Sequence, residues 1–338
     1  QGAPQSEKIA NEWLLARNPK KRISLLDEVV PALIKTKWGQ YSPYNNLCPY
    51  DEKTNNRTVT GCVATTMAQI MKYWSFPVSG RGEKTYTDNK YGELYADFAN
   101  TTYDWDNMTN EYNQNSTDEQ KTAVATLMYH CGIALSMRYG VAGSSSINGH
   151  IASSLKSYFM YDTDTIITRS NYDDNTWADI LKENLDNSQP IAYGGRSRNF
   201  GSHSFICDGY DTDGRFHFNL GWNGNSNGYY YIDSISTLKF NLSQEAVINI
   251  KPIKELNSQV SLLNPLELKQ EIVYQNSTVK IDANIVNNKV ESFSGSISLR
   301  LFDAEDNFLM NIAEQKIDNL EVNNPTEVTF ETNPLFNT

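Results

Sequence analysis

The sequence predicts an α+β domain followed by a small all-β module. Apolar residues recur at helical spacing through the first part of the chain, whereas from Pro190 onward they alternate in short runs between polar turns. Helices first and strands afterwards is the order of an α+β domain. From about residue 255 the chain contains no Cys, His or Trp. We therefore divide it into an N-terminal segment (1–28), an α+β domain (29–253) and a β-sandwich module (254–338).

Length and charge narrow the range of functions. The chain has 338 residues and a net charge of −11, which is spread along the sequence rather than gathered in a tail. This distribution argues against binding to nucleic acids or anionic membranes. No apolar run reaches membrane-spanning length, and the first residues do not form a signal peptide. We expect no nucleic-acid partner and no membrane insertion; if the protein is exported, its signal is absent from this sequence.

The cysteines and histidines do not predict a metal site or any other cofactor. Cys48, Cys62, Cys131 and Cys207 are too few for a disulfide framework, so we expect free thiols, although a Cys48–Cys62 bridge stays open. The histidines form no metal-binding motif. His203 and Cys207 lie in an expected strand, where four residues span about 13 Å, too far for one metal ion.

The N-terminal segment is polar and contains one short apolar helix pattern at residues 9–15 and a basic run at 20–22. It is either a peripheral segment removable by proteolysis or an ordinary helix packed on the domain. A turn-rich loop dense in aromatic residues follows at 38–46.

Residues 62–74 predict an amphipathic helix that begins at a cysteine. Thr60 is the expected N-cap, Gly61 permits a tight turn, and Cys62 then falls in the first turn. The helix dipole there favours negative charge, so we expect a lowered thiol pKa and a nucleophilic thiolate. The alternative is that Cys62 is a small buried apolar residue.

The remaining elements follow in order. Further helices are expected at 122–137, 150–159 and 177–185, with a glycine–serine loop at 139–146 that suits either close approach to a ligand or a plain connection. An antiparallel meander follows at 191–193, 203–207, 215–222 and 228–232. In the β module, alternation marks strands near 279–285, 297–301 and 328–330. The last of these lies so near residue 338 that a truncated module is one expectation.

A thiolate nucleophile needs a base, a group that orients the base, and donors for the oxyanion. His203, which opens a strand after small residues, is the best base. Asn219 on the next strand can orient it, and Trp222 can shield that hydrogen bond from water. Gln40 can supply a side-chain N–H beside the backbone N–H of Cys62.

Each of these residues also has a purely structural interpretation. Asn219 can end a strand, Gln40 can sit in a turn, and Trp222 can belong to the core. His217 competes with His203 as a base, although its place between Phe216 and Phe218 suits packing better. The joint arrangement favours the functional interpretation, because the nucleophile starts a helix while base and orienter lie on later, adjacent strands.

Several motifs resemble those of streptopain-like cysteine peptidases. The most specific is GCVATTMAQIMKY at residues 61–73, which is similar to the active-site helix of that family. The likeness recurs in order at WGQYSPYN (38–45), GSHSF (201–205), DGYD (208–211) and NLGW (219–222). It covers about residues 29–253, so the β module is an addition relative to streptopain.

The resemblance implies a papain-like fold of two subdomains and a secreted, cell-surface or periplasmic bacterial endopeptidase. It also implies a zymogen inhibited by its own pro-region, protein or peptide substrates, and a preference for a hydrophobic residue at the second position before the scissile bond. Residues 1–28 are then a remnant of the pro-region or a linker. By resemblance, the residues of the site are Cys62 as nucleophile, His203 as general base and acid, Asn219 as orienter, Gln40 as oxyanion donor and Trp222 as shield.

The resemblance also places substrate-binding loops. The expected cleft residues are Gly143, Ser144, Ser145, Gly194, Gly195 and Ser202. Two positions depart from the family pattern. Leu220 stands where tryptophan is common, so we expect a thinner aromatic lid over His203, and Ser202 replaces the second glycine of Gly-Gly-His, which narrows the cleft.

Two other functions stay open at this point. One is a different acyl transfer by the same cysteine and histidine, as in a transglutaminase-like enzyme or an amidase. The other is an adhesin that binds through its β-sandwich while the papain-like part is inert.

Overall fold

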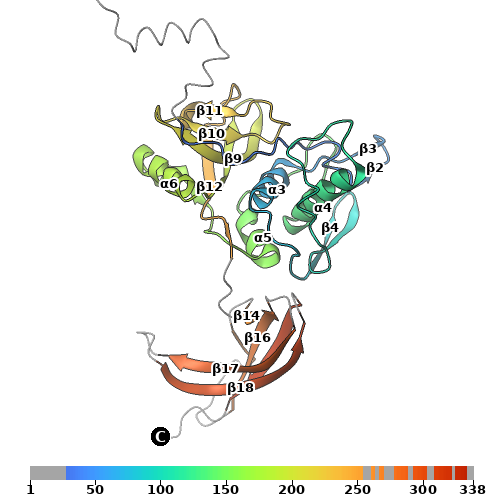
Figure 1. Cartoon of the computed structure of the whole chain (residues 1–338), viewed down its shortest axis with the longest axis vertical. Coiled ribbons are helices and arrows are strands. Elements are labelled where there is room, and N and C mark those ends of the chain that lie inside the picture. The colour runs from blue at the N-terminus through green and yellow to red at the C-terminus, as the bar shows by residue number, and fades with distance from the viewer. Residues whose placement is uncertain are drawn as a thin grey trace, which may run out of the picture.

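The computed structural model describes residues 28–253, 260–262, 266–269, 278–287, 292–302, 308–321 and 324–332. The helix expected at 9–15 lies outside these ranges. Residues 28–253 form a domain of helices, one large antiparallel sheet and three two-stranded sheets, and the later strands form sheets of their own (Figure 1). The predicted α+β class with additional C-terminal β structure is confirmed.

All the helices expected after residue 60 are present, with small differences at their ends. They are α3 (Cys62–Trp74), α4 (Asp118–Ala134), α5 (His150–Phe159) and α6 (Asp174–Asp186), with the short 3-10 helices η2 (Arg169–Asn171) and η3 (Ile232–Ser234). Helix α4 starts earlier than residue 122 because Thr117 and Gln120 form a capping box. It ends before residue 137, and Ser136 then adopts a positive φ of 48°.

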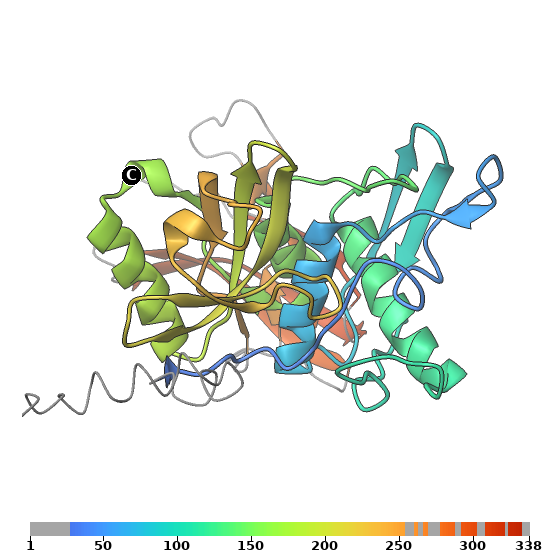
Figure 2. The same ribbon diagram turned by 90° about the horizontal axis from the view of Figure 1, so that it is seen from above.

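The predicted meander is the centre of a seven-stranded antiparallel sheet (Figure 2). Its strands run in the order β11-β10-β9-β8-β12-β7, and β1 also pairs with β9. They are β1 (Glu28–Val30), β7 (Ile167–Thr168), β8 (Ile191–Ser197), β9 (Gly201–Asp211), β10 (Phe216–Asn219), β11 (Gly228–Tyr230) and β12 (Leu242–Val247). Strand β9 is the longest of these strands and carries His203 near its start.

Short paired strands lie around the helices of the domain. They are β2 (Tyr50–Asp51) with β3 (Asn56–Arg57), β4 (Glu83–Asp88) with β5 (Gly92–Asp97), and β6 (Tyr161–Asp162) with β13 (Lys251–Pro252).

Two apolar cores explain the two-subdomain architecture. The first surrounds α3, α4 and α5 and includes Met67, Ile70 and Leu127. The second lies between the sheet and α6 and includes Trp177 and Phe218. Helix α3 lies between α4 and the sheet, so its first turn is at the boundary between the cores (Figure 1).

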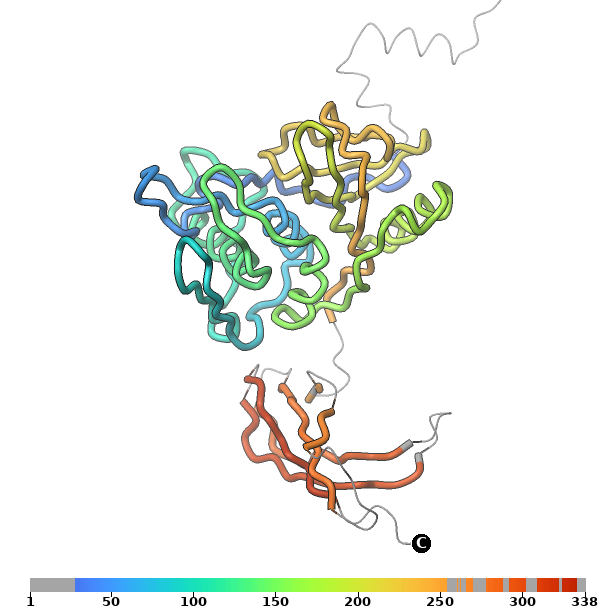
Figure 3. The backbone as a smooth tube through the Cα atoms, turned by 180° about the vertical axis from the view of Figure 1, so that it is seen from behind, coloured from blue at the N-terminus to red at the C-terminus, as the bar shows by residue number. Residues whose placement is uncertain are grey.

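The described C-terminal strands form a small β module with its own core (Figure 3). One sheet contains β14 (Val260–Leu262), β15 (Glu267–Leu268), β16 (Lys280–Asn287) and β19 (Thr326–Glu331), and a long hairpin is formed by β17 (Phe293–Phe302) and β18 (Phe308–Leu320). Residues from both, among them Ile285, Val328, Ile297 and Leu320, share one apolar cluster. Two sheets packed on a shared core is the arrangement expected of a β-sandwich.

None of the helices in the described ranges has the length and apolar character needed to cross a membrane.

Candidate active site

Helix α3 begins at Cys62 because Gly61 permits an unusual backbone conformation. Gly61 is the N-cap, with φ 86° and ψ 145°, a region that is essentially restricted to glycine. A Cβ atom at this position would lie 2.9 Å from the Sδ atom of Met137 and 3.1 Å from the carbonyl oxygen of Ser144. The expectation that Thr60 caps the helix was wrong, since its hydroxyl pairs with the Thr65 hydroxyl at 3.0 Å.

The Cys62 thiol lies at the first position of α3 but is largely enclosed by protein. Burial raises the pKa of the Cys62 thiol, while the backbone N–H groups of Ser204, Val63 and Cys62 itself act in the opposite direction. The helix start therefore does not lower the thiol pKa overall, because desolvation is the larger effect. All four cysteines are free, so Cys48 and Cys62 are not bridged.

The ring of His203 is held by a backbone carbonyl. Its Nε2 atom lies 2.8 Å from the carbonyl oxygen of Leu220. A carbonyl can only accept, so Nε2 carries the proton and Nδ1 is left as the acceptor nitrogen. This tautomer is the one a general base needs, because Nδ1 can take a proton from a thiol.

Aromatic side chains surround the same ring. Trp222 stacks on it with ring centroids 4.6 Å apart and an interplanar angle of 25°, while Phe240 and Phe205 lie at 5.3 and 5.7 Å. Burial lowers the pKa of His203 to about 4, so the imidazole is neutral at neutral pH. Phe240 was not anticipated from the sequence. Leu220 lies fully buried in the second core, and the aromatic cover over His203 comes from these three rings.

Asn219 lies next to the histidine's partner but is not that partner. Its side-chain amide donates to the carbonyl oxygen of Thr36 at 2.8 Å, and its Oδ1 accepts the N–H of Gly221 at 3.1 Å. The structure therefore replaces the expected amide–imidazole hydrogen bond with one to the Leu220 carbonyl. The reason is local: the Asn219 side chain bends back over its own chain, which fixes the peptide carrying that carbonyl.

Gln69, which the sequence analysis missed, connects α3 to this turn. Its Oε1 accepts the hydroxyl of Thr36 at 2.9 Å, and its Nε2 lies 3.4 Å from Oδ1 of Asn219. The side chain is 1% exposed. The available signal was a glutamine among the apolar residues of a predicted helix, because a polar group that is buried there needs partners.

The Gln40 loop passes beside the start of α3. The backbone carbonyl of Gln40 accepts the N–H of Thr60 at 3.1 Å, and the N–H of Asn223 donates to the carbonyl of Trp38. A Cβ atom on Gly39 would lie 2.4 Å from Oδ1 of Asn223, so the Asn223 side chain occupies the space beside this glycine. These contacts bring the loop close to both the cysteine and the tryptophan segments.

Cys62 and His203 line one pocket, of about 260 Å³. Residues from α3, β8, β9, β12 and the 144–148 loop form its walls. Apart from Cys62 and His203, the lining is mostly small and polar: Val63, Ser144, Ser145, Ser146, Asn148, Gly195, Ser202, Ser204, Ser243 and Glu245. Gln40, Asn219 and Trp222 stand outside the pocket lining.

The expected cleft loops are only partly at this pocket. Ser144, Ser145, Gly195 and Ser202 line it. Gly194 lies beneath it, since a Cβ atom there would be 3.1 Å from both Asn148 and Glu245. Gly143 instead lines a neighbouring pocket beside β4. The N–H of Gly140 donates to the hydroxyl of Ser144, which closes the 140–144 loop on itself. Gly143 therefore faces away from the Cys62 pocket.

Asn148, Ser243 and Glu245 were missed, because each is brought to the pocket by pairing between distant segments. Glu245 pairs with Gly194 across β12 and β8. Asn148 is positioned by the hydroxyl of Ser204, which donates to its Oδ1 at 2.7 Å.

The competing histidine has a different role. His217 Nδ1 lies 2.6 Å from Oδ1 of Asp208, whose other oxygen accepts the N–H of Ile34. His217 is not among the residues that line the pocket with Cys62. This pair ties β10 to the chain that follows β1, so we assign it to structure.

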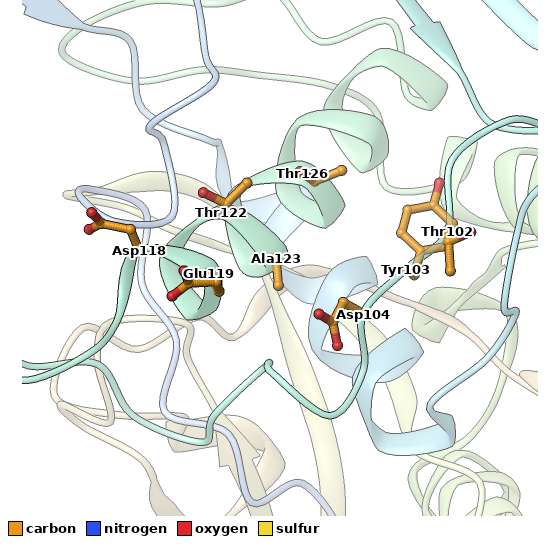
Figure 4. Close-up of a pocket in the computed structure, with 8 residues that line it drawn as sticks. All are labelled: Thr102, Tyr103, Asp104, Asp118, Glu119, Thr122, Ala123 and Thr126. Carbon is orange, nitrogen blue, oxygen red and sulfur yellow. The ribbon is translucent and has the colours of Figure 1, made fainter.

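A separate pocket of about 410 Å³ lies along α4 (Figure 4). Asp118 and Glu119 on the helix and Asp104 on the facing loop supply carboxylates. Its lining includes no cysteine or histidine, so the combination of nucleophile and base occurs at the Cys62 pocket and not here.

A thiol at the start of a buried helix and a neutral imidazole on a facing sheet, between two cores, define the papain-like class of cysteine peptidase folds. Residues 38–230 match the peptidase C10 family. The chain belongs to the peptidase C10 family.

Characterised relatives agree with this membership. Streptopain of Streptococcus pyogenes is 33% identical over 252 residues, which cover 66% of this chain and 63% of that protein. The thiol protease/hemagglutinin PrtT of Porphyromonas gingivalis is 32% identical over 227 residues, covering 64% of this chain and 26% of that protein. The chain thus spans about 63% of the length of the streptopains it matches.

Solved structures give the same result. The active interpain A cysteine protease of Prevotella intermedia is 40% identical with a TM-score of 0.60, covering 65% of this chain and 95% of that one. A prointerpain A fragment from the same organism is 36% identical with a TM-score of 0.57, and the match covers 73% of this chain and 85% of that fragment. The streptopain-like resemblance is confirmed.

Proposed function

We propose that this protein is a cysteine endopeptidase that hydrolyses peptide bonds through an acyl-enzyme intermediate. The observation that carries the proposal is that Cys62 and His203, from separate elements, line one pocket in a chain of the peptidase C10 family. The similarity to streptopain, PrtT and interpain A supports the same activity.

The proposed reaction starts from a Cys62 thiol, whose pKa burial raises, and a His203 imidazole, whose pKa burial lowers. Nδ1 of His203 removes the proton from the Cys62 thiol, and the thiolate attacks the carbonyl carbon of the scissile peptide. The resulting oxyanion accepts the backbone N–H of Cys62 and, as proposed from the resemblance, the side-chain N–H of Gln40. His203 then protonates the leaving amine as the C–N bond breaks. Water, activated by the same imidazole, hydrolyses the thioester and releases the thiol.

Asn219 and Trp222 act through His203 in this scheme. Asn219 fixes the turn that presents the Leu220 carbonyl to Nε2, and Trp222 keeps water from that hydrogen bond. Both are therefore positioning residues.

Several finer properties complete the proposal. Ser144, Ser145, Gly195 and Ser202 contact the substrate directly, whereas Gly143 shapes the loop and Gly194 the strand behind them. The similarity to a prointerpain A fragment supports a precursor inhibited by its own pro-region. Secretion, a hydrophobic preference at the second position before the scissile bond, and the division at residues 28 and 253 are proposed from the family resemblance.

A peptide-library cleavage profile of the wild-type protein beside Cys62→Ala tests the function. We expect cleavage of casein and of library peptides by the wild type, inhibition by an epoxysuccinyl thiol reagent, and no cleavage by a folded Cys62→Ala variant. Incorporation of amines without cleavage would identify another acyl transferase. An alkylatable Cys62 with no hydrolysis of any peptide would instead support a binding protein.

A further inference from the structure

The pocket beside the reacting pair contains a carboxylate that the mechanism does not use. Glu245 lies on β12, directly opposite Gly194 on β8. Because Gly194 has no side chain, the Glu245 side chain lies across it: a Cβ atom at residue 194 would be 3.1 Å from both Cγ and Oε1 of Glu245. The carboxylate is therefore directed along the pocket wall rather than outward.

The surroundings leave this carboxylate without a partner. Among the described residues that line the pocket, Glu245 alone is acidic, and none is a lysine or an arginine. Burial raises the pKa of the Glu245 carboxyl, and no neighbouring cation opposes that effect. A half-buried carboxylate without a cation is costly, and a cation that enters the pocket removes that cost.

A second unsatisfied group lies at the same place. Asn148 is 5% exposed and its Oδ1 is occupied by Ser204, but its Nδ2 has no hydrogen-bond partner in the described part of the chain. This nitrogen is also 3.1 Å from the Cβ position of residue 194, next to the carboxylate. The nitrogen has essentially no exposed surface, so it lies in the wall behind the carboxylate, where its neutral amide supplies no cation to Glu245.

We propose that Glu245 makes this pocket accept a lysine or arginine side chain of the peptide substrate. The inference rests on the proposed peptidase function. The family resemblance implies a hydrophobic residue at the second position before the scissile bond. Lysine and arginine are compatible with that preference, because each combines an apolar stem with a cationic end. Val63 contacts the stem, and the surrounding serines accommodate the polar end.

The test compares two fluorogenic peptides that differ only at the second position before the scissile bond, one with arginine and one with leucine. Wild type, Glu245→Gln and Glu245→Leu are assayed, with Glu183→Gln on the exposed face of α6 as the matched control. Loss of a hydrogen-bonded charge partner predicts a fall of about tenfold or more in kcat/KM for the arginine peptide. The kcat/KM for the leucine peptide should fall less than that for the arginine peptide, and Glu245→Leu should raise the ratio of leucine to arginine cleavage.

Titration of the Cys62 thiol with an epoxysuccinyl reagent distinguishes a failure of the specificity inference from a failure of the proposed peptidase function. An unchanged arginine-to-leucine ratio in a Glu245→Gln variant that is still active overturns the specificity inference alone. A wild type that is folded but neither reacts with the reagent nor cleaves either peptide overturns the peptidase function, and this inference falls with it. A wild type that cleaves the leucine peptide and not the arginine peptide also contradicts the proposal.

Discussion

His203 takes its orientation from a main-chain atom rather than from the side chain expected to hold it. The Leu220 carbonyl cannot be lost by substitution, so the tautomer depends on the shape of a turn. The three aromatic rings around the imidazole then set its basicity, because they exclude the water that would stabilise a charged ring.

This environment predicts the pH dependence of activity. Only the neutral imidazole accepts the thiol proton, and burial lowers the pKa of His203 from 6.5 to about 4. As the pH falls, the base is therefore lost near pH 4 and not near 6.5. The acid limb of a kcat/KM–pH profile should lie well below 6.5.

A substitution at Trp222 supplies the control for that profile. Trp222→Ala admits water to the ring and should move the acid limb up towards 6.5, whereas Trp222→Phe, which keeps a stacked ring, should move it less. A wild-type acid limb at or above 6.5 would contradict the assignment of His203 as a buried neutral base.

Substitution of Asn219 should be less damaging than substitution of His203. His203→Ala removes the base and should reduce kcat by at least about 10⁴-fold. Asn219→Ala leaves the imidazole and the Leu220 carbonyl in place and only loosens the turn, so we expect a loss of about 100-fold or less. Equal losses in folded variants, measured with one peptide substrate, would contradict the positioning role.

At the scale of single elements, the start of α3 depends on one glycine. Gly61→Ala combines a positive φ with crowding against Met137 and the Ser144 carbonyl, so we expect a loss of about 2–6 kcal/mol in unfolding free energy. The displaced thiol should also be alkylated at an altered rate. Chemical denaturation and thiol labelling measure the two effects.

Gly92 provides the matched control for backbone strain. It has a φ of 76° in the β4–β5 turn, and a Cβ atom there would have nothing within 4 Å. Gly92→Ala should therefore cost only about 1 kcal/mol and leave the thiol unaffected. Similar costs at both glycines would show that crowding at Gly61 is not important.

Local patterns predicted the elements well, and their ends less well. The pattern at residues 62–74 predicted α3 with its bounds, but the expected single buried face was wrong, because every residue from Val63 to Met71 is buried between α4 and the sheet. Residues 191–193 understated β8, which continues to Ser197 through glycines that carry no apolar signal. Helix α4 begins earlier than the apolar pattern predicts, because its first turn is polar and is held by the capping box of Thr117 and Gln120.

The site was predictable where its residues lie in local motifs and not where distant segments meet. Cys62, His203 and Trp222 are in or beside short, specific motifs. The Leu220 carbonyl is a main-chain group with no residue-type signal. Glu245 reaches the pocket only through the register of β12 against β8, which one sequence does not reveal.

At the scale of the whole molecule, the β module has a core of its own. No described residue beyond 253 lines the Cys62 pocket. We therefore expect a chain of residues 28–253 to fold and to keep the kcat/KM of the full chain for a small peptide. A folded truncated protein, verified by circular dichroism, with strongly reduced kcat/KM would show that the module supports catalysis.

The two apolar cores of the catalytic domain have a consequence for inactivation. Cys62 packs against one core, and the ring of His203 lies beside the other. The hydrogen bonds of Gln69 with Thr36 and Asn219 connect the two sides of the boundary between the cores. A small separation of the two cores would move the Cys62 sulfur away from Nδ1 of His203 while every helix and strand stays folded. Mild denaturant or pressure should therefore abolish peptide cleavage before circular dichroism detects any loss of secondary structure.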